Sequence, residues 1–284
     1  MADPSALRER LDRRLGLLRS LLIYRAIPWR GAQLRRLLRR FVPAGGLAFD
    51  IGAHAGNRVD AMLALGARVV ALEPQADFAR LLARRFGADP RVALEAAAAG
   101  RAPGRARLLA SARTPTVATL SPRFVERAGA APSFRGVRWS AGPEVDLTTL
   151  DVLIARHGRP DFVKIDVEGF ELEVLLGLSQ PLPALSFEFV PALIDVALAC
   201  VDRLEALAAR DDRGGAGAYL YAAALGERHH LLQPQGVPAD AMRAWLRDRP
   251  RASASGDVYA WRAPAHPQEG GDTDCGVRQS MSAR

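Results

Sequence analysis

The first 44 residues alternate leucine and arginine in a pattern that is typical of amphipathic helices. Leucines spaced three or four positions apart predict one helix over residues 5–24, with arginines on its other sides. A second helix is predicted over Gln33–Phe41, where Pro43 stops it, and Pro28–Gly31 are expected to form the turn between the two. The apolar stripe of the first helix comprises Leu7, Leu11, Leu15, Leu18 and Leu22.

From Leu47 onward, short apolar runs alternate with segments of helical spacing. This alternation predicts an α/β fold built around a mostly parallel sheet. The expected strands are Leu47–Ile51, Arg68–Pro74, Arg91–Glu95, Arg105–Ala110 at the sheet edge, Asp161–Val167, Ala184–Phe189, Ala218–Ala224 and Asp257–Trp261. The expected helices are Val59–Leu65, Gln75–Phe86, a helix from the capping residues Thr148 and Thr149 to His157, one that ends at Gly177, Pro191–Ala209 and Ala239–Arg247.

Two segments lack a sustained period. Residues 111–146 carry four prolines and predict a long loop, which within a compact domain is expected to face the substrate. From about Pro264 the chain is polar, and we expect a disordered tail. The predicted organisation is therefore a basic helical extension over residues 1–44, one α/β domain over 45–263 and a tail over 264–284.

The first predicted strand, Leu47–Ile51, leads into a glycine-rich turn and then a helix. Glycines let the backbone approach a ligand closely, and the free N–H groups of the helix start can bind it. The spacing is Asp50-x-Gly52-x-x-x-Gly56, whereas dinucleotide-binding folds carry G-x-G-x-x-G. An acid in the turn repels a pyrophosphate and suits a cationic ligand. S-adenosylmethionine (SAM) fits that charge, since it carries an ammonium and a sulfonium and no phosphate.

Four of the predicted strands end close to an acidic residue. Because ligands of open α/β sheets bind outside the carboxyl ends of the strands, these acids are expected to line one crevice. Glu73, at the end of the second strand, is placed to accept hydrogen bonds from the hydroxyls of an adenosine ribose. The other three acids are Asp50, Asp166 and Glu188.

Lys164 and Asp166 lie two positions apart on a strand and therefore share a face. A buried lysine needs a partner, so we expect Lys164 to bridge to a carboxylate and hold the strand ends together, with substrate positioning as the alternative. Asp166 and Glu188 are the first candidates for a general base, and His54, which we otherwise expect to hydrogen-bond the turn, is the third. The histidines beyond residue 200 have no metal-ligand spacing, so no metal is predicted.

The composition is that of an ordinary globular protein, but the charge is unevenly placed. The 284 residues are 49% hydrophobic and 25% charged, with a net charge of +8. Residues 1–42 contain eleven arginines and three acidic residues, and the remainder is neutral, so a uniformly basic nucleic-acid-binding surface is not expected. We expect the basic N-terminus to pack on its own domain, with contact to anionic membrane lipids or an acidic partner as the alternative.

The cysteines and the apolar runs both indicate a cytoplasmic protein. Two cysteines, one of them in the polar tail, give no disulfide framework and fit a reducing compartment. No apolar run reaches membrane-spanning length. Leu15–Tyr24 is interrupted by Arg19 and lacks a cleavage site, so no signal peptide is expected.

Several motifs resemble the FkbM family of SAM-dependent methyltransferases. The most distinctive is KIDVEGxE at Lys164–Glu171, within DFVKIDVEGFELEVLLGL, whereas the glycine-rich turn alone is shared by many methyltransferases. The resemblance covers about Leu47–Phe189, with weaker agreement to Trp261. The other motifs are FDIGAHAGN at Phe49–Asn57, ALEP at Ala71–Pro74, TLD at Thr149–Asp151 and LSFEF at Leu185–Phe189.

The resemblance implies a class I methyltransferase fold, with a seven-stranded sheet, a reversed last strand and helices on both faces. It also implies O-methylation of a hydroxyl on a sugar, glycan or polyketide-type compound. Two departures concern ligand contacts, because the family often has Asn in place of His54 and a more polar segment than Ser111–Ser121. By motif position, Asp50, Gly52 and Gly56 would border the methionine end of SAM, Glu73 its ribose and Ala98 its adenine, and the other expected cofactor contacts are His54, Asn57, Pro74 and Asp166.

Two other functions stay open on the sequence alone. A nicotinamide-dependent oxidoreductase is disfavoured by the missing third glycine and by Asp50 in the turn. A non-catalytic module that binds SAM or a glycan would keep the same motifs. Neither the methyl acceptor nor the oligomeric state follows from the sequence.

Overall fold

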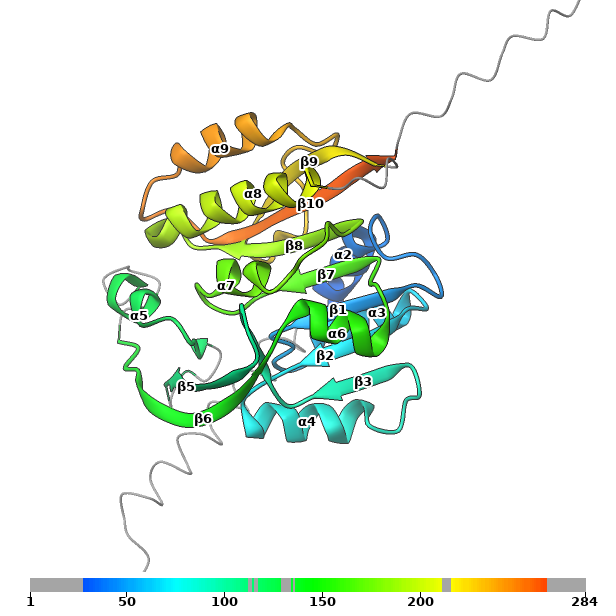
Figure 1. Cartoon of the computed structure of the whole chain (residues 1–284), viewed down its shortest axis with the longest axis vertical. Helices are drawn as coiled ribbons and strands as arrows, with labels where there is room; N and C mark the ends of the chain where they lie inside the picture. The colour runs from blue at the N-terminus through cyan, green and yellow to red at the C-terminus, as the bar shows by residue number, and fades with distance from the viewer. Residues whose placement is uncertain are drawn as a thin grey trace, which may run out of the picture.

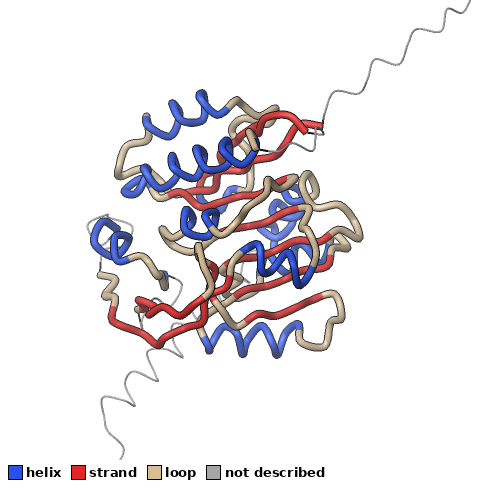
Figure 2. Tube along the Cα trace, in the orientation of Figure 1, coloured by secondary structure: helices blue, strands red, loops and turns tan. Residues whose placement is uncertain are grey.

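The computed structural model describes residues 28–264, apart from 112–113, 115–116, 129–133, 135 and 211–215. A seven-stranded sheet forms its centre, with helices on both faces (Figures 1 and 2). The strands lie in the order β3 (Val92–Glu95), β2 (Arg68–Leu72), β1 (Leu47–Ile51), β7 (Phe162–Ile165), β8 (Ala184–Phe189), β10 (Gly256–Pro264) and β9 (Ala216–Leu225). This order confirms the predicted class I methyltransferase sheet.

The direction of β10 sets it apart from the rest of the sheet. The pairs that join β3, β2, β1, β7 and β8 are parallel, whereas β10 runs antiparallel to both of its neighbours, β8 and β9. In Figure 1 the arrow of β10 accordingly points away from that of β8. The first residues of β10 therefore lie beside the carboxyl end of β8, where Asp257 is in register with Glu188.

Alternate residues of the strands pack into two separate cores. Leu47, Phe49 and Ile51 of β1 belong to one core, whereas Ala48 belongs to the other, as the two-residue period of a strand requires. The first core is covered by α6 (Leu150–His157), α7 (Glu171–Leu176), α8 (Ile194–Ala208) and α9 (Ala239–Arg247), and the second by α2 (Pro28–Leu38), α3 (Asn57–Ala64) and α4 (Ala76–Phe86).

A second, smaller sheet stands beside the carboxyl ends of the central strands (Figure 1). We had predicted Arg105–Ala110 as a continuation of the main sheet edge, and that prediction is wrong. The strand pairs instead with a partner from residues 111–146, which we had expected to be a loop. This sheet has the order β4 (Ala98–Ala99), β6 (Ser140–Thr148) and β5 (Gly104–Ala110), and the segment before β6 also contains α5 (Pro122–Ala128).

Helix α2 begins earlier than predicted. Pro28–Gly31, which were expected to connect two helices, instead form the first helical turn of α2. Proline is favourable at this position, because the first N–H groups of a helix have no partner within the helix. Leu34, Leu37 and Phe41 are buried against the sheet, and the ring of Phe41 stacks on Tyr259 at 5.3 Å between centroids. This part of the N-terminal region thus packs on its own domain.

The predicted leucine-rich helix over residues 5–24 and the C-terminal tail beyond Pro264 lie outside the described residues. Membrane contact through the N-terminus therefore stays a prediction. Within the described part of the chain, no helix is both long enough and apolar enough to cross a bilayer.

Candidate active site

A cleft of about 180 Å³ opens outside the carboxyl ends of the central strands. This is where ligands of open α/β sheets bind, and the volume is far above the ~10–15 Å³ that a single water needs. The turn after β1, the end of β2, the loop after β7, the end of β8 and the start of β10 all contribute to it. Leu108 of β5 and residues 118–120 of the segment before α5 close the side next to the small sheet.

Most of the residues predicted for the site line this cleft, and three do not. Asp50 and Lys164 lie beneath its floor, and Gly56 faces α4, where an added Cβ would come within 2.5 Å of the Phe86 ring. The predicted residues that do line the cleft are Gly52, His54, Asn57, Glu73, Pro74, Ala98, Asp166 and Glu188.

The turn after β1 is shaped by close contact with two neighbouring strands. The N–H groups of Gly52 and Ala53 both donate to the Leu72 carbonyl, each at 2.9 Å. Gly52 has a φ of 88°, and a Cβ there would lie 2.0 Å from the backbone oxygen of Asp166. Only glycine allows both this positive φ and the close approach of the Asp166 backbone. The fold itself therefore requires the first glycine of the motif, whether or not a ligand contacts it.

Glu73 is held in place by backbone donors at the end of β2. Its two carboxylate oxygens accept hydrogen bonds from the N–H groups of His54, at 2.9 Å, and Gln75, at 2.8 Å. Burial raises the pKa of Glu73 to about 7, although these hydrogen bonds favour the charged form. The carboxylate is thereby fixed in the cleft wall, with lone pairs left to accept further donors.

His54 occupies the turn in a left-handed conformation, with a φ of 47°. Its ring lies 3.8 Å from that of Phe78, measured between centroids. Burial lowers the pKa of His54 to about 4, so the imidazole is neutral at pH 7. A low pKa makes His54 a weak proton acceptor.

Asp50 is completely buried and faces the same side of the sheet as Lys164, its register partner on β7. Neither carboxylate oxygen has a hydrogen-bond partner among the described residues. Burial raises the pKa of Asp50 to about 6, against the opposing field of Arg58. Asp50 is therefore buried behind the cleft and does not line it.

Lys164 forms the predicted bridge between strand ends. Its Nζ lies 2.6 Å from Asp257 Oδ1 on β10 and 3.5 Å from Asp166 Oδ2, and its side chain is only 2% exposed. The ammonium thus joins β7 to the reversed strand. Asp257, the closer partner, was not predicted as a site residue from the sequence.

Asp166 lies between two cations. Besides Lys164, the Arg58 guanidinium contacts it, with Nη2 2.7 Å from Oδ2. Burial opposes the charge of Asp166, but Lys164 and Arg58 lower its pKa to about 2. A carboxylate with so low a pKa holds charge well and is a poor proton acceptor.

The loop after β7 is fixed by the residues of the KIDVEGFE stretch itself. Glu171 Oε1 accepts hydrogen bonds from the N–H groups of Val167, at 3.2 Å, and Gly169, at 3.1 Å. Glu168 has a φ of 55°, and its carbonyl accepts a hydrogen bond from Thr119 Oγ1 at 2.7 Å. These contacts hold Glu168 in a strained backbone conformation that directs it into the cleft.

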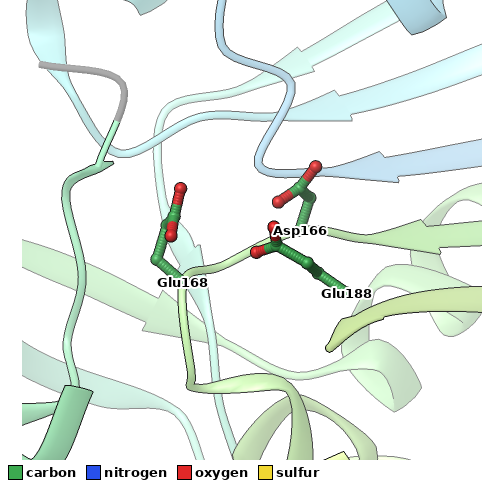
Figure 3. Close-up of side chains that lie close together, drawn as sticks. All are labelled: Asp166, Glu168 and Glu188. Carbon is green, nitrogen blue, oxygen red and sulfur yellow. The ribbon is translucent and has the colours of Figure 1, made fainter. Parts of the chain in front are cut away.

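Three carboxyls meet where this loop faces the end of β8. Asp166, Glu168 and Glu188 each offer an oxygen within 4.8 Å of the other two, and Figure 3 shows the three groups turned toward a common space. Burial, followed by the charges of the neighbouring carboxyls, raises the pKa values of Glu168 and Glu188. Such a group of oxygens can take a cation, and the prediction that no metal binds stays a prediction.

Sequence reasoning missed four charged residues of the cleft: Arg58, Glu168, Glu227 and Asp257. A signal existed for two of them. Arg58 directly follows the glycine-rich turn at the start of a helix, and Asp257 begins a strand that runs opposite to the others, which brings its first residues to the site. Glu168 lies within the KIDVEGxE motif but has no feature of its own that marks it, and nothing local marks Glu227.

The chain matches a known protein family over most of its length. The model of the FkbM methyltransferase domain family matches residues 50–249. No curated protein sequence matches the chain.

Among solved structures, an O-methyltransferase from Bacillus cereus in complex with S-adenosylhomocysteine (SAH) is 16% identical, with 93% of each chain covered and a TM-score of 0.40. A putative O-methyltransferase from Klebsiella pneumoniae is 13% identical, covering 92% of this chain and 91% of that one at a TM-score of 0.40. Precorrin-6y C5,15-methyltransferase from Geobacter metallireducens is 16% identical over 82% and 86% of the two chains, at a TM-score of 0.38.

Proposed function

Since the chain belongs to the FkbM family of SAM-dependent methyltransferases, we propose that it methylates a hydroxyl group of a sugar, glycan or polyketide-type compound. The family assignment removes the nicotinamide-dependent alternative. Bound SAM supplies an electrophilic methyl group, so the chain's own residues have to bind the cofactor, orient the acceptor oxygen and take up its proton.

The charges of the cleft fit SAM. A carboxylate wall suits the ammonium and sulfonium of this ligand, and would repel the pyrophosphate of a dinucleotide. Within the described residues, a single arginine and no lysine line the cleft. The acids that line it are Glu73, Asp166, Glu168, Glu188, Glu227 and Asp257.

The polar and apolar ends of the cleft support a placement for the cofactor. Glu73, fixed by two backbone N–H groups, accepts hydrogen bonds from the ribose hydroxyls. Ala98 and Leu108 provide the apolar surface for the adenine. The methionine end then lies along the turn that contains Gly52 and Asn57, toward Asp166.

The main support for a hydroxyl as the methyl acceptor is the environment of the Glu188 carboxylate. Its Oε2 is completely buried, has no hydrogen-bond partner among the described residues and belongs to a residue of the cleft wall. A buried acceptor without a partner is costly, and a substrate hydroxyl would supply the missing donor. Glu188 then accepts the proton as the acceptor oxygen forms its bond to the methyl carbon and the bond from that carbon to sulfur breaks.

Glu188 is a better base than the two other candidates. Its pKa is raised by burial and by the nearby carboxyl of Glu168, whereas the pKa of Asp166 falls to about 2 and that of His54 to about 4. The conjugate base of a group with a higher pKa binds a proton more strongly. We therefore assign proton removal to Glu188, and charge balance to Asp166.

The test uses radiolabelled SAM and a panel of hydroxylated sugars and polyketide-type compounds. Glu188→Gln is expected to lower turnover by a factor on the order of 10²–10⁴ while SAH binding is kept. Glu144→Gln, at an exposed carboxylate on β6, is the matched control and should leave turnover unchanged. Near-normal turnover in Glu188→Gln would move the base to His54, and SAM binding without transfer to any hydroxyl would favour a non-catalytic module.

A further inference from the structure

The cleft contains one cationic side chain in an otherwise acidic wall. Arg58 is the sole arginine or lysine lining the cleft within the part of the chain that the structure describes, and the neighbouring His54 is neutral at pH 7 because burial lowers its pKa to about 4. In the methylation chemistry proposed above, Arg58 serves only to hold Asp166 and its charge. As the one cation of this wall among the described residues, Arg58 is the side chain that could pair with a ligand group of negative charge.

Arg58 is also well placed for such a role. It is the second residue of α3, directly after the turn, and its side chain is 26% exposed. Helix N-termini favour anionic ligands, because their N–H groups are free and the helix dipole is positive there. Burial opposes the charge of Arg58, but the surrounding carboxylates, Asp166 first, raise its pKa and keep it protonated.

The contact with Asp166 makes a matched pair of charges. Arg58 Nη2 lies 2.7 Å from Asp166 Oδ2, and both residues line the cleft. A guanidinium has five N–H donors in a planar fork, so one carboxylate does not exhaust it. An amino acid carries an ammonium and a carboxylate on the same carbon, so it can pair both of its charges with Asp166 and Arg58 at once.

We propose that Arg58 binds the carboxylate of the methionine end of SAM, with Asp166 beside it taking the ammonium. This inference rests on the proposed placement of SAM in the cleft. It assigns the Arg58–Asp166 pair to recognition of an intact amino acid, so nucleosides that lack the carboxylate bind weakly. The alternative is that Arg58 only holds Asp166 in position and touches no ligand.

Titration calorimetry with two nucleosides separates these roles. One is SAH, and the other is its decarboxylated analogue, S-adenosyl-3-thiopropylamine, which keeps the ammonium and lacks the carboxylate. The wild-type protein should bind SAH roughly 10- to 100-fold more tightly than the analogue, the range for a hydrogen-bonded charge pair. In Arg58→Met this preference should fall to less than about threefold, because only SAH loses a contact.

Two further variants control the experiment. Arg84→Met removes an exposed arginine of α4, which changes the net charge equally, and should keep the wild-type preference. Arg58→Lys keeps the charge without the planar fork and should give an intermediate preference. It also serves if Arg58→Met fails to fold, as judged by circular dichroism and thermal unfolding.

The remaining outcomes overturn the assignment. Equal weakening of both nucleosides in Arg58→Met would mean that Arg58 acts only through Asp166, since both ligands carry the ammonium. The carboxylate contact would be refuted if the wild-type protein bound both nucleosides equally well. It would also be refuted if Arg58→Met kept the wild-type preference for SAH. If neither nucleoside binds the wild-type protein, the placement of SAM in the cleft fails before the role of Arg58 is reached.

Discussion

The two sides of the cleft hold their carboxylates by different means. On the side made by β1 and β2, Glu73 is fixed by backbone N–H groups from residues 54 and 75, which belong to the same β-α-β unit. On the side made by β7, β8 and β10, Asp166 is fixed by the side chains of Arg58 and Lys164, and Lys164 in turn depends on Asp257. The first side uses local backbone contacts, whereas the second uses ion pairs between distant segments.

This difference suits the two sides to different tasks. The backbone N–H groups that hold Glu73 cannot move independently of the chain, so they keep its carboxylate in one orientation. This suits a ligand of constant structure, such as SAM. The ion-paired side contains three carboxyls within 4.8 Å of one another, two of them with raised pKa values. Carboxyls this close favour the protonated form of one another, so the group can hold a proton taken from an acceptor hydroxyl.

The largest expected effect is at the contact between the two sides. Gly52→Ala would place a Cβ 2.0 Å from the Asp166 carbonyl oxygen at a φ of 88°. We expect the free energy of unfolding, measured by urea denaturation, to fall by more than about 3 kcal/mol.

Gly45→Ala is the matched control for this variant. Gly45 also has a positive φ, 74°, but nothing lies within 4 Å of its added Cβ, so only the backbone cost of about 1–2 kcal/mol applies. Equal losses in the two variants would show that the contact between the sides adds nothing to stability.

Removing the carboxylate of the backbone-held side should weaken the cofactor complex. Glu73→Ala is expected to reduce SAH affinity by ~1.5–3 kcal/mol, the scale for hydrogen bonds to a charged group. Glu188→Ala, on the ion-paired side, should change SAH affinity by less than about 0.5 kcal/mol, the usual effect of a substitution that removes no ligand contact. Calorimetry on both variants tests whether only the backbone-held side binds the cofactor. A similar loss of SAH affinity in the two variants would contradict this.

The raised pKa of Glu73 predicts a pH dependence of cofactor binding. Its ordinary value is 4.5 and its value in the cleft is about 7, so the carboxyl gains a proton as the pH falls below 7. The protonated form is a poorer acceptor for ribose hydroxyls, so SAH affinity should decrease from pH 8 to pH 5.5, by at most about tenfold per unit below pH 7. Glu73→Gln, which does not titrate, should have a shallower profile; an unchanged profile would assign the dependence to another group.

The smallest expected effect is that of removing divalent cations. Asp166 is already neutralised by Arg58 and Lys164, so the acidic group that it forms with Glu168 and Glu188 carries less charge than its composition implies. Turnover should stay within about twofold after treatment with a chelator or addition of Mg²⁺, far below the several kcal/mol that a catalytic metal contributes. Loss of activity with the chelator, restored by Mg²⁺, would show that this side binds a metal.

The backbone-held side was readable from the sequence, and the reason is its locality. The strand, the turn from Gly52 to Asn57 and the acid at Glu73 lie within one β-α-β unit, so spacing alone placed them correctly. The strands with continuous apolar runs were equally clear, and β8 was predicted to the residue. Burial on both faces leaves an unmistakable pattern in such strands.

The ion-paired side was only partly readable, because its contacts join distant segments. The acids Asp166 and Glu188 were found, but Arg58 and Asp257 were not, since each acts through a partner elsewhere in the chain. The prediction of a loop over residues 111–146 was wrong for a similar reason. Its strand β6 is mostly exposed and contains few apolar residues, so that pairing with β5, rather than an apolar pattern, determines its structure.

The position of β10 has a consequence for how the protein is made. β10 inserts between β8 and β9, although β9 is synthesised before it, and Asp257 reaches back 93 residues to pair with Lys164. At ~5–20 residues per second, translation leaves the edge of β8 unpaired for several seconds, and Lys164 without its nearest carboxylate. The nascent chain therefore passes through a stage with an open strand edge, a surface that chaperones bind and that favours aggregation. A premature stop before Gly256 would make that stage permanent, so even a short C-terminal truncation into β10 should give an insoluble product rather than a weakened enzyme.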